Sequence, residues 1–317
     1  MALEKSDLPE LDPALQQELV TALLPRFQEL LQDESIDEDL QQAFTEVYAP
    51  LAHWIAQGHP GSLQFIGLNG AQGAGKSTLV KILRMLLSEG FGFRTEVLSI
   101  DDLYLQPEQR QVLADTIHPL FRTRGVPGTH DIALGLELVS ALRKQQPGEQ
   151  VQLPRFDKTI DRRHPQSAWT PVNEPLDILI LEGWCVGAKP QSEAELDTPV
   201  NSLETEQDPR GEWRRASNQA LAGPYQALFE KLDLLLMMQV PTFEAVHRWR
   251  SLQESKLGEK AAMGPEDLQQ FVMHYERLTR AQLRPVMSVL YFLQTLPCKQ
   301  LQVLRRRFPN SNAHSGN

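Results

Sequence analysis

Residues 70–77 read Gly70-Ala71-Gln72-Gly73-Ala74-Gly75-Lys76-Ser77, which fits the pattern G-x-x-x-x-G-K-[ST] of phosphate-binding loops. The apolar run Leu63–Leu68 before it predicts a buried strand. Apolar residues at helical spacing after it, from Leu79 to Leu87, predict a helix that ends at Gly90. Strand, glycine-rich loop and helix direct backbone N–H groups and a helix N-terminus at a single anion.

We therefore expect residues 70–78, which end at Thr78, to bind a nucleoside triphosphate such as ATP. In such loops the lysine, here Lys76, reaches the β- and γ-phosphates, and the hydroxyl at the position of Ser77 ligates Mg²⁺. The sequence contains neither the Asn-Lys-x-Asp guanine motif nor the Leu-Ser-Gly-Gly-Gln transporter signature. A P-loop enzyme of the small-molecule kinase type is the reading that these absences favour.

Two further predicted strands end in acidic residues. The strand from Arg94 to Ile100 runs directly into Asp101 and Asp102, and the buried strand Leu176–Leu181 ends at Glu182. Ligands of open α/β sheets bind beyond the carboxyl ends of the strands. Asp101 is therefore a candidate base for an attacking hydroxyl, although a water-mediated Mg²⁺ ligand is an open alternative. Asp102 has the alternative of capping a short helix or turn, and Glu182 is a candidate for the metal shell.

Basic side chains gather in two places. Arg122, Arg124 and His130 crowd the Gly- and Pro-rich loop 121–131, and a positive loop suits an anionic ligand, with solvated surface charge as the alternative. Thr129 or Asp131 could also cap the helix that follows. A second basic stretch lies on the predicted helix 243–257, after the core strand 232–240, where small-molecule kinases keep a lid. Its candidate lid residues are Arg248 and Arg250, again with a solvated face as the alternative.

We predict that the chain divides into an N-terminal helical extension (1–60), a P-loop domain (61–308) and a disordered tail (309–317). Within the P-loop domain, about residues 189–210 form an acidic segment, which we expect to be an exposed and mobile insertion. Two apolar stripes in the N-terminal extension are expected to pack on the flank of the domain, with a partner-binding hairpin as the alternative. A last edge strand is expected near 302–307.

Composition narrows the possible partners and location. The 317 residues carry a formal net charge of −10, which argues against a general nucleic-acid or membrane-surface binder. The two cysteines, Cys185 and Cys298, form no spaced metal motif, and we expect no disulfide scaffold. The first residues lack signal-peptide features, and no apolar run approaches the ~20 residues of a membrane span. We expect a cytoplasmic protein that binds a small anionic molecule; the sequence does not indicate protein partners.

Several stretches between Phe65 and Arg280 resemble, in order, the D-glycerate 3-kinase family of plants and microbes. That family belongs to the superfamily of uridine kinase, phosphoribulokinase and pantothenate kinase. The stretches that carry the resemblance are Gly73-Ala74-Gly75-Lys76-Ser77-Thr78-Leu79-Val80, Ser99-Ile100-Asp101-Asp102-Leu103-Tyr104-Leu105, Arg124-Gly125, Gly128-Thr129-His130-Asp131, Pro154-Arg155-Phe156-Asp157-Lys158, Glu182-Gly183-Trp184 and Trp249-Arg250 with Gln253-Glu254 and Lys256.

The resemblance implies a three-layer α/β P-loop NTPase fold with a mainly parallel central sheet. It also implies transfer of the ATP γ-phosphate to the 3-hydroxyl of D-glycerate, with Asp101 as the base and Glu182 near the metal. The substrate-pocket residues that it implies are Arg124, His130, Asp131, Arg155, Asp157 and Lys158. The alternatives are a related kinase that acts on pantothenate, a nucleoside or a sugar phosphate, and a non-enzymatic ATP-binding regulatory protein.

Overall fold

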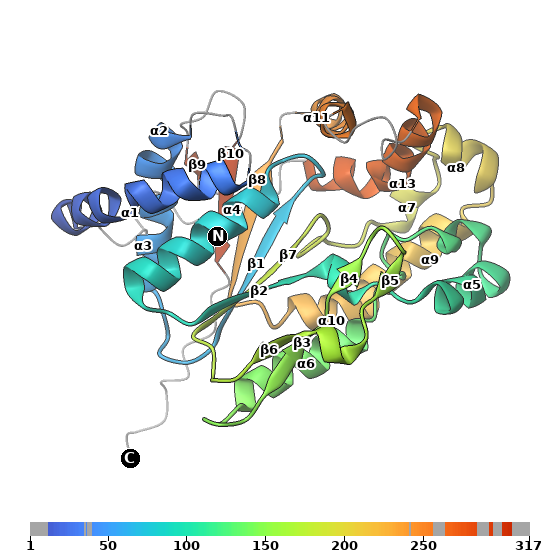
Figure 1. Ribbon diagram of the computed structural model, residues 1–317. Helices are drawn as coiled ribbons and strands as arrows, with labels where there is room; N and C mark the ends of the chain where they lie inside the picture. The colour runs from blue at the N-terminus through green and yellow to red at the C-terminus, as the bar shows by residue number, and fades with distance from the viewer. Residues whose placement is uncertain are drawn as a thin grey trace, which may run out of the picture.

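The protein is built around a six-stranded sheet in the order β2-β7-β1-β8-β10-β9 (Figure 1). The computed structural model describes residues 12–34, 36, 40–240, 242–255, 264–283, 292–293 and 300–305. Four neighbouring strands run parallel, and β10 pairs antiparallel with both β8 and β9. In sheet order the strands are β2 (Thr95–Ser99), β7 (Ile178–Gly183), β1 (Gln64–Gly70), β8 (Leu234–Gln239), β10 (Gln300–Arg305) and β9 (Phe292–Leu293).

This sheet confirms the predicted α/β fold with mainly parallel strands. The expected strand near 302–307 corresponds to β10, which lies inside the sheet because β9 flanks it. The predicted tail 309–317 lies outside the described residues, and the division of the chain at residues 60 and 308 stays a prediction. No helix in the described ranges is both long enough and apolar enough to span a membrane.

The phosphate-binding loop joins the central strand β1 to α4 (Lys76–Met85), which continues as the π-helical turn η3 (Leu86–Gly90). Every residue of β1 is buried, as its apolar sequence predicts. Gly73 and Gly75 have φ angles of +76° and +85°, a region that residues with a Cβ rarely adopt. The glycines of the motif therefore make the turn into α4 possible.

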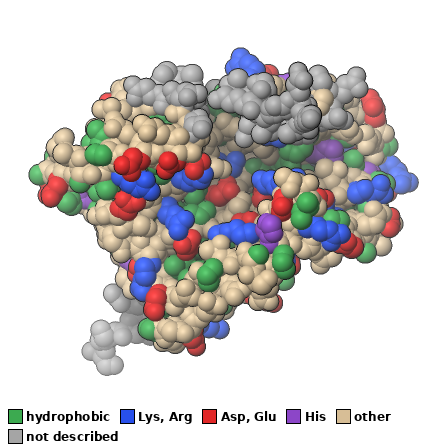
Figure 2. All heavy atoms as spheres, in the orientation of Figure 1, with side chains coloured by type: hydrophobic (Ala, Val, Ile, Leu, Met, Phe, Trp, Pro, Cys, Tyr) green, Lys and Arg blue, Asp and Glu red, His purple; other side chains and the backbone are tan. Residues whose placement is uncertain are grey.

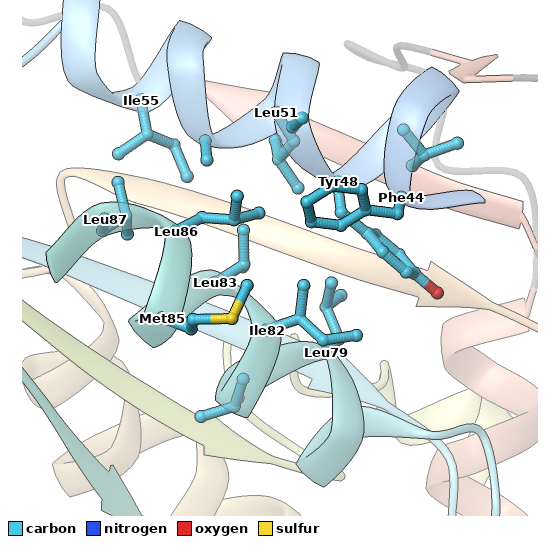
Figure 3. Packing of buried hydrophobic residues seen from close by; sticks show 14 of the residues in the cluster. Phe44, Tyr48, Leu51, Ile55, Leu79, Ile82, Leu83, Met85, Leu86 and Leu87 are labelled. Carbon is cyan, nitrogen blue, oxygen red and sulfur yellow. The ribbon is translucent and has the colours of Figure 1, made fainter. Parts of the chain in front are cut away.

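The N-terminal helices cover one face of the sheet by packing on α4. They are α1 (Pro13–Asp33), α2 (Gln41–Ala43), the π-helical η2 (Phe44–Tyr48) and α3 (Ala49–Gln57). Asp12 caps α1 by accepting hydrogen bonds from two backbone N–H groups of the first turn. In Figure 3, Phe44, Leu51 and Ile55 face Ile82, Leu83 and Leu86 of α4, and all belong to one buried cluster. The expected packing on the flank of the domain is thus confirmed.

A second helical layer covers the opposite face. It contains α6 (Ile132–Lys144), α9 (Glu212–Ala220), η7 (Leu221–Tyr225) and α10 (Gln226–Phe229). Alternate residues of the same strands face the two layers: Ile178 and Ile180 join the N-terminal cluster, whereas Leu179 and Leu181 join the cluster of α6 and α10. The sheet is therefore the middle of three layers, as Figure 1 shows.

Smaller elements lie at the carboxyl edge of the sheet and beside the second layer. The helices are the 3₁₀ turn η4 (Ile100–Leu103), α5 (Pro107–Thr116), the 3₁₀ turns η5 (Pro119–Arg122) and η6 (Gln166–Ala168), α11 (Phe243–Ser255) and α13 (Pro265–Leu283). Two short antiparallel pairs complete the fold, and they are β3 (Val151–Leu153) with β6 (Thr170–Val172), and β4 (Phe156–Asp157) with β5 (Arg162–Arg163).

Most residues of the acidic segment 189–210 are exposed, as its composition predicts, but buried side chains anchor it to the domain. It forms α7 (Glu193–Leu196) and α8 (Ser202–Gln207), and Leu196 and Leu203 are buried. Its two buried carboxylates form ion pairs with arginines later in the sequence. Asp208 pairs with Arg214 on α9, and Glu204 pairs with Arg277 on α13. The expected exposure thus holds for most of the segment, but its composition did not indicate these buried anchors, and its mobility stays a prediction.

Candidate active site

The phosphate end of the site is the loop between β1 and α4. Lys76 Nζ donates a hydrogen bond to the carbonyl oxygen of Ala71 at 3.0 Å, so the side chain folds back over its own loop. Burial lowers the pKa of Lys76, and the nearby carboxylates of Glu182 and Asp101 oppose that shift. Ser77 is exposed on the first turn of α4. The lysine and the candidate hydroxyl ligand thus lie side by side at the start of α4, with two carboxylates close to the lysine.

Glu182 lies at the end of β7, in register with Ser99 on β2 and with Leu68 on β1. Burial raises the pKa of its carboxyl group, and the charge of Lys76 and a hydrogen bond from Ser99 oppose the rise. Within the described ranges no three His, Cys, Asp or Glu side chains gather into a metal-binding group. The candidate donors named from the sequence are the Glu182 carboxylate and the Ser77 hydroxyl, and oxygen donors of this kind suit Mg²⁺, which is bound by few protein ligands together with substrate phosphates.

The two adjacent aspartates at the end of β2 have different partners. Asp101 is ion-paired with Lys158 through Oδ2 and Nζ at 2.7 Å. Burial raises the pKa of Asp101, but Lys158, His130 and a hydrogen bond from Tyr104 together bring it below the ordinary value. Asp101 is therefore ionised at neutral pH, as a general base has to be.

Asp102, by contrast, forms hydrogen bonds with the backbone of two neighbouring segments. Its carboxylate accepts hydrogen bonds from the N–H groups of Ser99 (3.2 Å) and Phe156 (2.9 Å) and pairs with Arg155 at 3.1 Å. The first of these bonds closes a capping box around η4. The alternative that Asp102 caps a short helix is confirmed, and its contacts also attach the strand β4 to the end of β2.

The structure brings Arg124 and Lys158 together beside Asp101. The Arg124 guanidinium pairs with Asp161, donates to the carbonyl oxygen of Lys158 at 3.2 Å and lies over the Phe156 ring, 5.7 Å from its centroid. The Lys158 side chain is 61% exposed apart from its contact with Asp101. The two cations thus lie near the candidate base and remain candidates for binding an anionic acceptor.

His130 is placed next to the same base but below the surface. Its Nδ1 is hydrogen-bonded to the Tyr225 hydroxyl at 2.5 Å, and its ring stacks on Tyr104 with centroids 4.4 Å apart. The other nitrogen, Nε2, is buried and has no hydrogen-bond partner among the described residues. Burial lowers the pKa of His130 to about 4, against the opposing charge of Asp101. The ring is therefore neutral at physiological pH.

Three other predicted pocket residues have their polar groups engaged by neighbouring protein groups. Asp131 caps α6 by accepting from the N–H of Leu134 at 3.1 Å, as one sequence alternative anticipated. The Arg155 guanidinium is held by Asp102 and by the carbonyl oxygen of Val97. Asp157 accepts hydrogen bonds from the backbone N–H and the hydroxyl of Thr159. These contacts favour positioning roles over direct contact with a substrate.

The candidate lid helix α11 packs directly on the phosphate-binding loop. A Cβ added to Gly73 would lie 2.8 Å from the Cβ of Trp249, so the two backbones approach as closely as glycine allows. The guanidinium of Arg250 lies over the Phe271 ring of α13 at 5.2 Å, and Arg248 is exposed. Lys256, the last residue of the family resemblance, lies outside the described residues.

Several residues at the site were not predicted. Tyr104 hydrogen-bonds to Asp101, and its place in the same motif was the available signal. Tyr225 and Tyr275 come from distant helices with no motif around them. Asp161 sits in the turn between β4 and β5 and pairs with both Arg110 and Arg124. Charged residues spread over this face with both signs interspersed (Figure 2), so surface charge alone does not mark these positions.

Comparison with known proteins places the chain among P-loop kinases. No protein-family model matches it. The solved structure of D-glycerate 3-kinase from Cryptococcus neoformans superposes with a TM-score of 0.61, covering 89% of this chain and 95% of that one at 22% identity, which supports the fold. Among curated sequences, the chloroplastic D-glycerate 3-kinase of Arabidopsis thaliana is 30% identical over 219 residues, and the match covers 66% of this chain but only 45% of that protein.

A second curated relative shares most of its length with the chain. The uncharacterized kinase mug58 of Schizosaccharomyces pombe is 32% identical over 224 residues, which are 66% of this chain and 77% of that kinase. Kinase relatives therefore agree with what the structure shows. It has a phosphate-binding loop, and the strands β2 and β7 end in acidic residues. The chain belongs to the family of P-loop kinases that includes mug58 and D-glycerate 3-kinase.

Proposed function

We propose that the protein transfers the γ-phosphate of ATP to the 3-hydroxyl group of D-glycerate, forming 3-phosphoglycerate and ADP. The observation that carries this proposal is the position of Asp101. Its carboxylate acts on the pKa of Lys76 in the phosphate-binding loop and is paired with Lys158 at 2.7 Å on the other side. A base thus lies between a phosphate site and a cationic pocket, and a relative of that name supports glycerate as the acceptor.

In this reaction Asp101 accepts the proton of the 3-hydroxyl group as its oxygen attacks the γ-phosphorus. The bond between that phosphorus and the bridging oxygen breaks, and ADP leaves with the electron pair. Lys76 neutralises charge on the β- and γ-phosphates, together with N–H groups of the loop. Arg124 binds the glycerate carboxylate, and Lys158, which is paired with Asp101, holds that base in place. The hydroxyl group is thereby kept close to Asp101, which contributes through proximity and orientation.

Mg²⁺ fits the donor set at the phosphate end. The Ser77 hydroxyl and the Glu182 carboxylate would hold it, and the ion would neutralise charge on the phosphate oxygens when bound. Glu182 supports this assignment because burial at the end of β7 disfavours its charged form, and Lys76 and Ser99 compensate this only in part. In the lid, Arg248 and Arg250 are our candidates for contacting the phosphates from α11.

The test is ATP turnover by the purified full-length protein with Mg²⁺. D-glycerate, pantothenate, uridine and ribulose 5-phosphate are compared as acceptors, and the product is identified by mass and by the position of its phosphate. We expect ADP release that depends on D-glycerate, with 3-phosphoglycerate as the product. Turnover with another acceptor only would support kinase activity but would overturn D-glycerate as the substrate. ATP binding without turnover on any acceptor would favour a regulatory protein.

A further inference from the structure

One carboxylate beside the acceptor pocket is shared by two arginines. Asp161, in the turn between β4 and β5, pairs through Oδ2 with Arg110 and through Oδ1 with Arg124. Arg110 is only 2% exposed, and its guanidinium also donates to the carbonyl oxygens of Leu105 and Arg122 at 3.2 and 2.7 Å. The carboxylate therefore joins a fixed, buried cation to a half-buried cation that faces the pocket.

The backbone at Asp161 is held in an unusual conformation. Its φ is +57°, a left-handed value that no other non-glycine residue in the described part of the chain adopts. Such conformations persist where surrounding contacts enforce them, and they are frequent at functional sites. Here the two arginines provide those contacts, and the turn they fix presents Lys158 to Asp101 and the Lys158 carbonyl to Arg124.

The charges of this arrangement limit what the pocket can bind. Two guanidiniums share one carboxylate, so the group Arg110–Asp161–Arg124 carries a single net positive charge. The neighbouring cation Lys158 is already neutralised by Asp101, and Arg155 by Asp102. A ligand with one negative charge therefore balances the group. A second negative charge would find no unpaired cation within this group.

We propose that Asp161 is a positioning residue that orients Arg124 and restricts the acceptor pocket to ligands with a single negative charge. This inference rests on the proposed function, because it assumes that the acceptor binds between Asp101 and Arg124. It excludes sugar phosphates, which carry about two negative charges at neutral pH, and admits small hydroxycarboxylates. Asp161 acts through Arg124 and does not contact the reacting atoms.

The test measures binding, so that it does not depend on turnover. D-lactate and tartronate share a hydroxycarboxylate group and differ by one negative charge. Their affinities for the full-length protein are measured by calorimetry with a non-hydrolysable ATP analogue present, for the wild type and for Asp161→Asn. Asparagine tolerates left-handed backbone better than most residues, so the substitution removes mainly the charge.

We expect the wild type to prefer D-lactate and Asp161→Asn to shift the affinity ratio towards tartronate by about tenfold. That is the effect of one unit charge about 10 Å away at an effective dielectric constant of about 20. The double variant Arg110→Met with Asp161→Asn restores the net charge of the group, and its ratio should return to that of the wild type. Loss of packing alone would not produce this return.

The control is Glu108→Gln, which removes one negative charge from the exposed pair with Arg162 on the same hairpin and should leave the ratio unchanged. If circular dichroism shows that Asp161→Asn does not fold, Arg124→Gln replaces it and should shift the ratio the opposite way. A ratio that stays within twofold in the folded variants, or no binding of either ligand, overturns the inference. Failure to form 3-phosphoglycerate would instead overturn the proposed function, and the binding ratio would still be measurable.

Discussion

The two ends of the candidate site are built in different ways. At the phosphate end, Lys76 bonds to a carbonyl only five residues away, and the glycines between them set the turn. At the acceptor end, contacts join residues that are far apart in sequence: Arg124 with Asp161 at a separation of 37, and Arg155 with Asp102 at 53. Phosphate binding is thus a property of a short stretch, whereas acceptor choice depends on how distant loops meet.

The largest effect should come from the phosphate end. We expect Lys76→Ala to lower kcat by about 10³-fold, because it removes a charged donor from the developing charge on the phosphates. The apparent KM for the acceptor should change little if the two ends are independent. Steady-state kinetics with varied acceptor checks this, and Lys81→Ala on the same helix, where Lys81 forms an exposed pair with Glu34, is the control. A large change in the KM for the acceptor would contradict the independence of the phosphate end and the acceptor end.

The next effect separates the two neighbouring aspartates. Asp101→Asn should lower kcat by about 100-fold or more while ATP still binds, because the variant cannot accept the proton of the attacking hydroxyl. Single-turnover phosphoryl transfer and nucleotide binding by calorimetry are the measurements. A rate close to that of the wild type would exclude Asp101 as the base.

Asp102→Asn should behave in the opposite way. Its carboxylate accepts two backbone hydrogen bonds and an arginine, so we expect the free energy of unfolding to fall by about 2 kcal/mol. The turnover of the folded enzyme should stay within about tenfold of the wild type. Urea unfolding followed by circular dichroism measures the first quantity. If Asp102→Asn lost activity as completely as Asp101→Asn while remaining as stable as the wild type, the division of roles between the pair would be wrong.

The burial of His130 at the acceptor end can be tested by the pH dependence of the free energy of unfolding. Its pKa lies at about 4 in the folded protein and at 6.5 when unperturbed, so between these values the unfolded chain binds a proton that the folded one does not. Stability contributed by the neutral ring is therefore present above pH 6.5 and is lost as the pH falls, by about 3 kcal/mol at pH 4. His130→Asn should lack this component. Equal losses for both proteins between pH 7 and pH 4 would contradict a buried neutral ring.

The smallest expected effect is a shift in a pH profile. Lys158→Met removes the cation that helps to keep the pKa of Asp101 low, while the burial that raises this pKa remains. The acid limb of kcat/KM should therefore move to higher pH, because Asp101 has to be ionised to act as a base. The profile is measured against D-glycerate in wild type and variant. An unmoved acid limb would mean that another group controls it.

The difference between local contacts at the phosphate end and distant contacts at the acceptor end also explains which features the sequence predicted. The strand, the glycines and α4 follow from local pattern and spacing, and the acidic ends of β2 and β7 follow from the rule that ligands lie beyond strand ends. Sequence reasoning named Arg124 and Lys158 and offered the helix cap for Asp131, but it could not show that Arg155 is held by Asp102, 53 residues away. It missed Asp161 because the partners Arg110 and Arg124 are brought to it only by the tertiary fold.

The buried ion pairs of the segment 189–210 have a consequence in salt. The Arg214 and Asp208 side chains are 2% and 1% exposed, and counterions screen such desolvated pairs much less than solvent-exposed ones. The exposed pair of Arg26 with Glu89, between α1 and the end of α4, should weaken at high ionic strength. Within the segment, the buried pairs should therefore persist at salt concentrations that weaken the exposed pairs of Glu193 and Asp197 with Arg215.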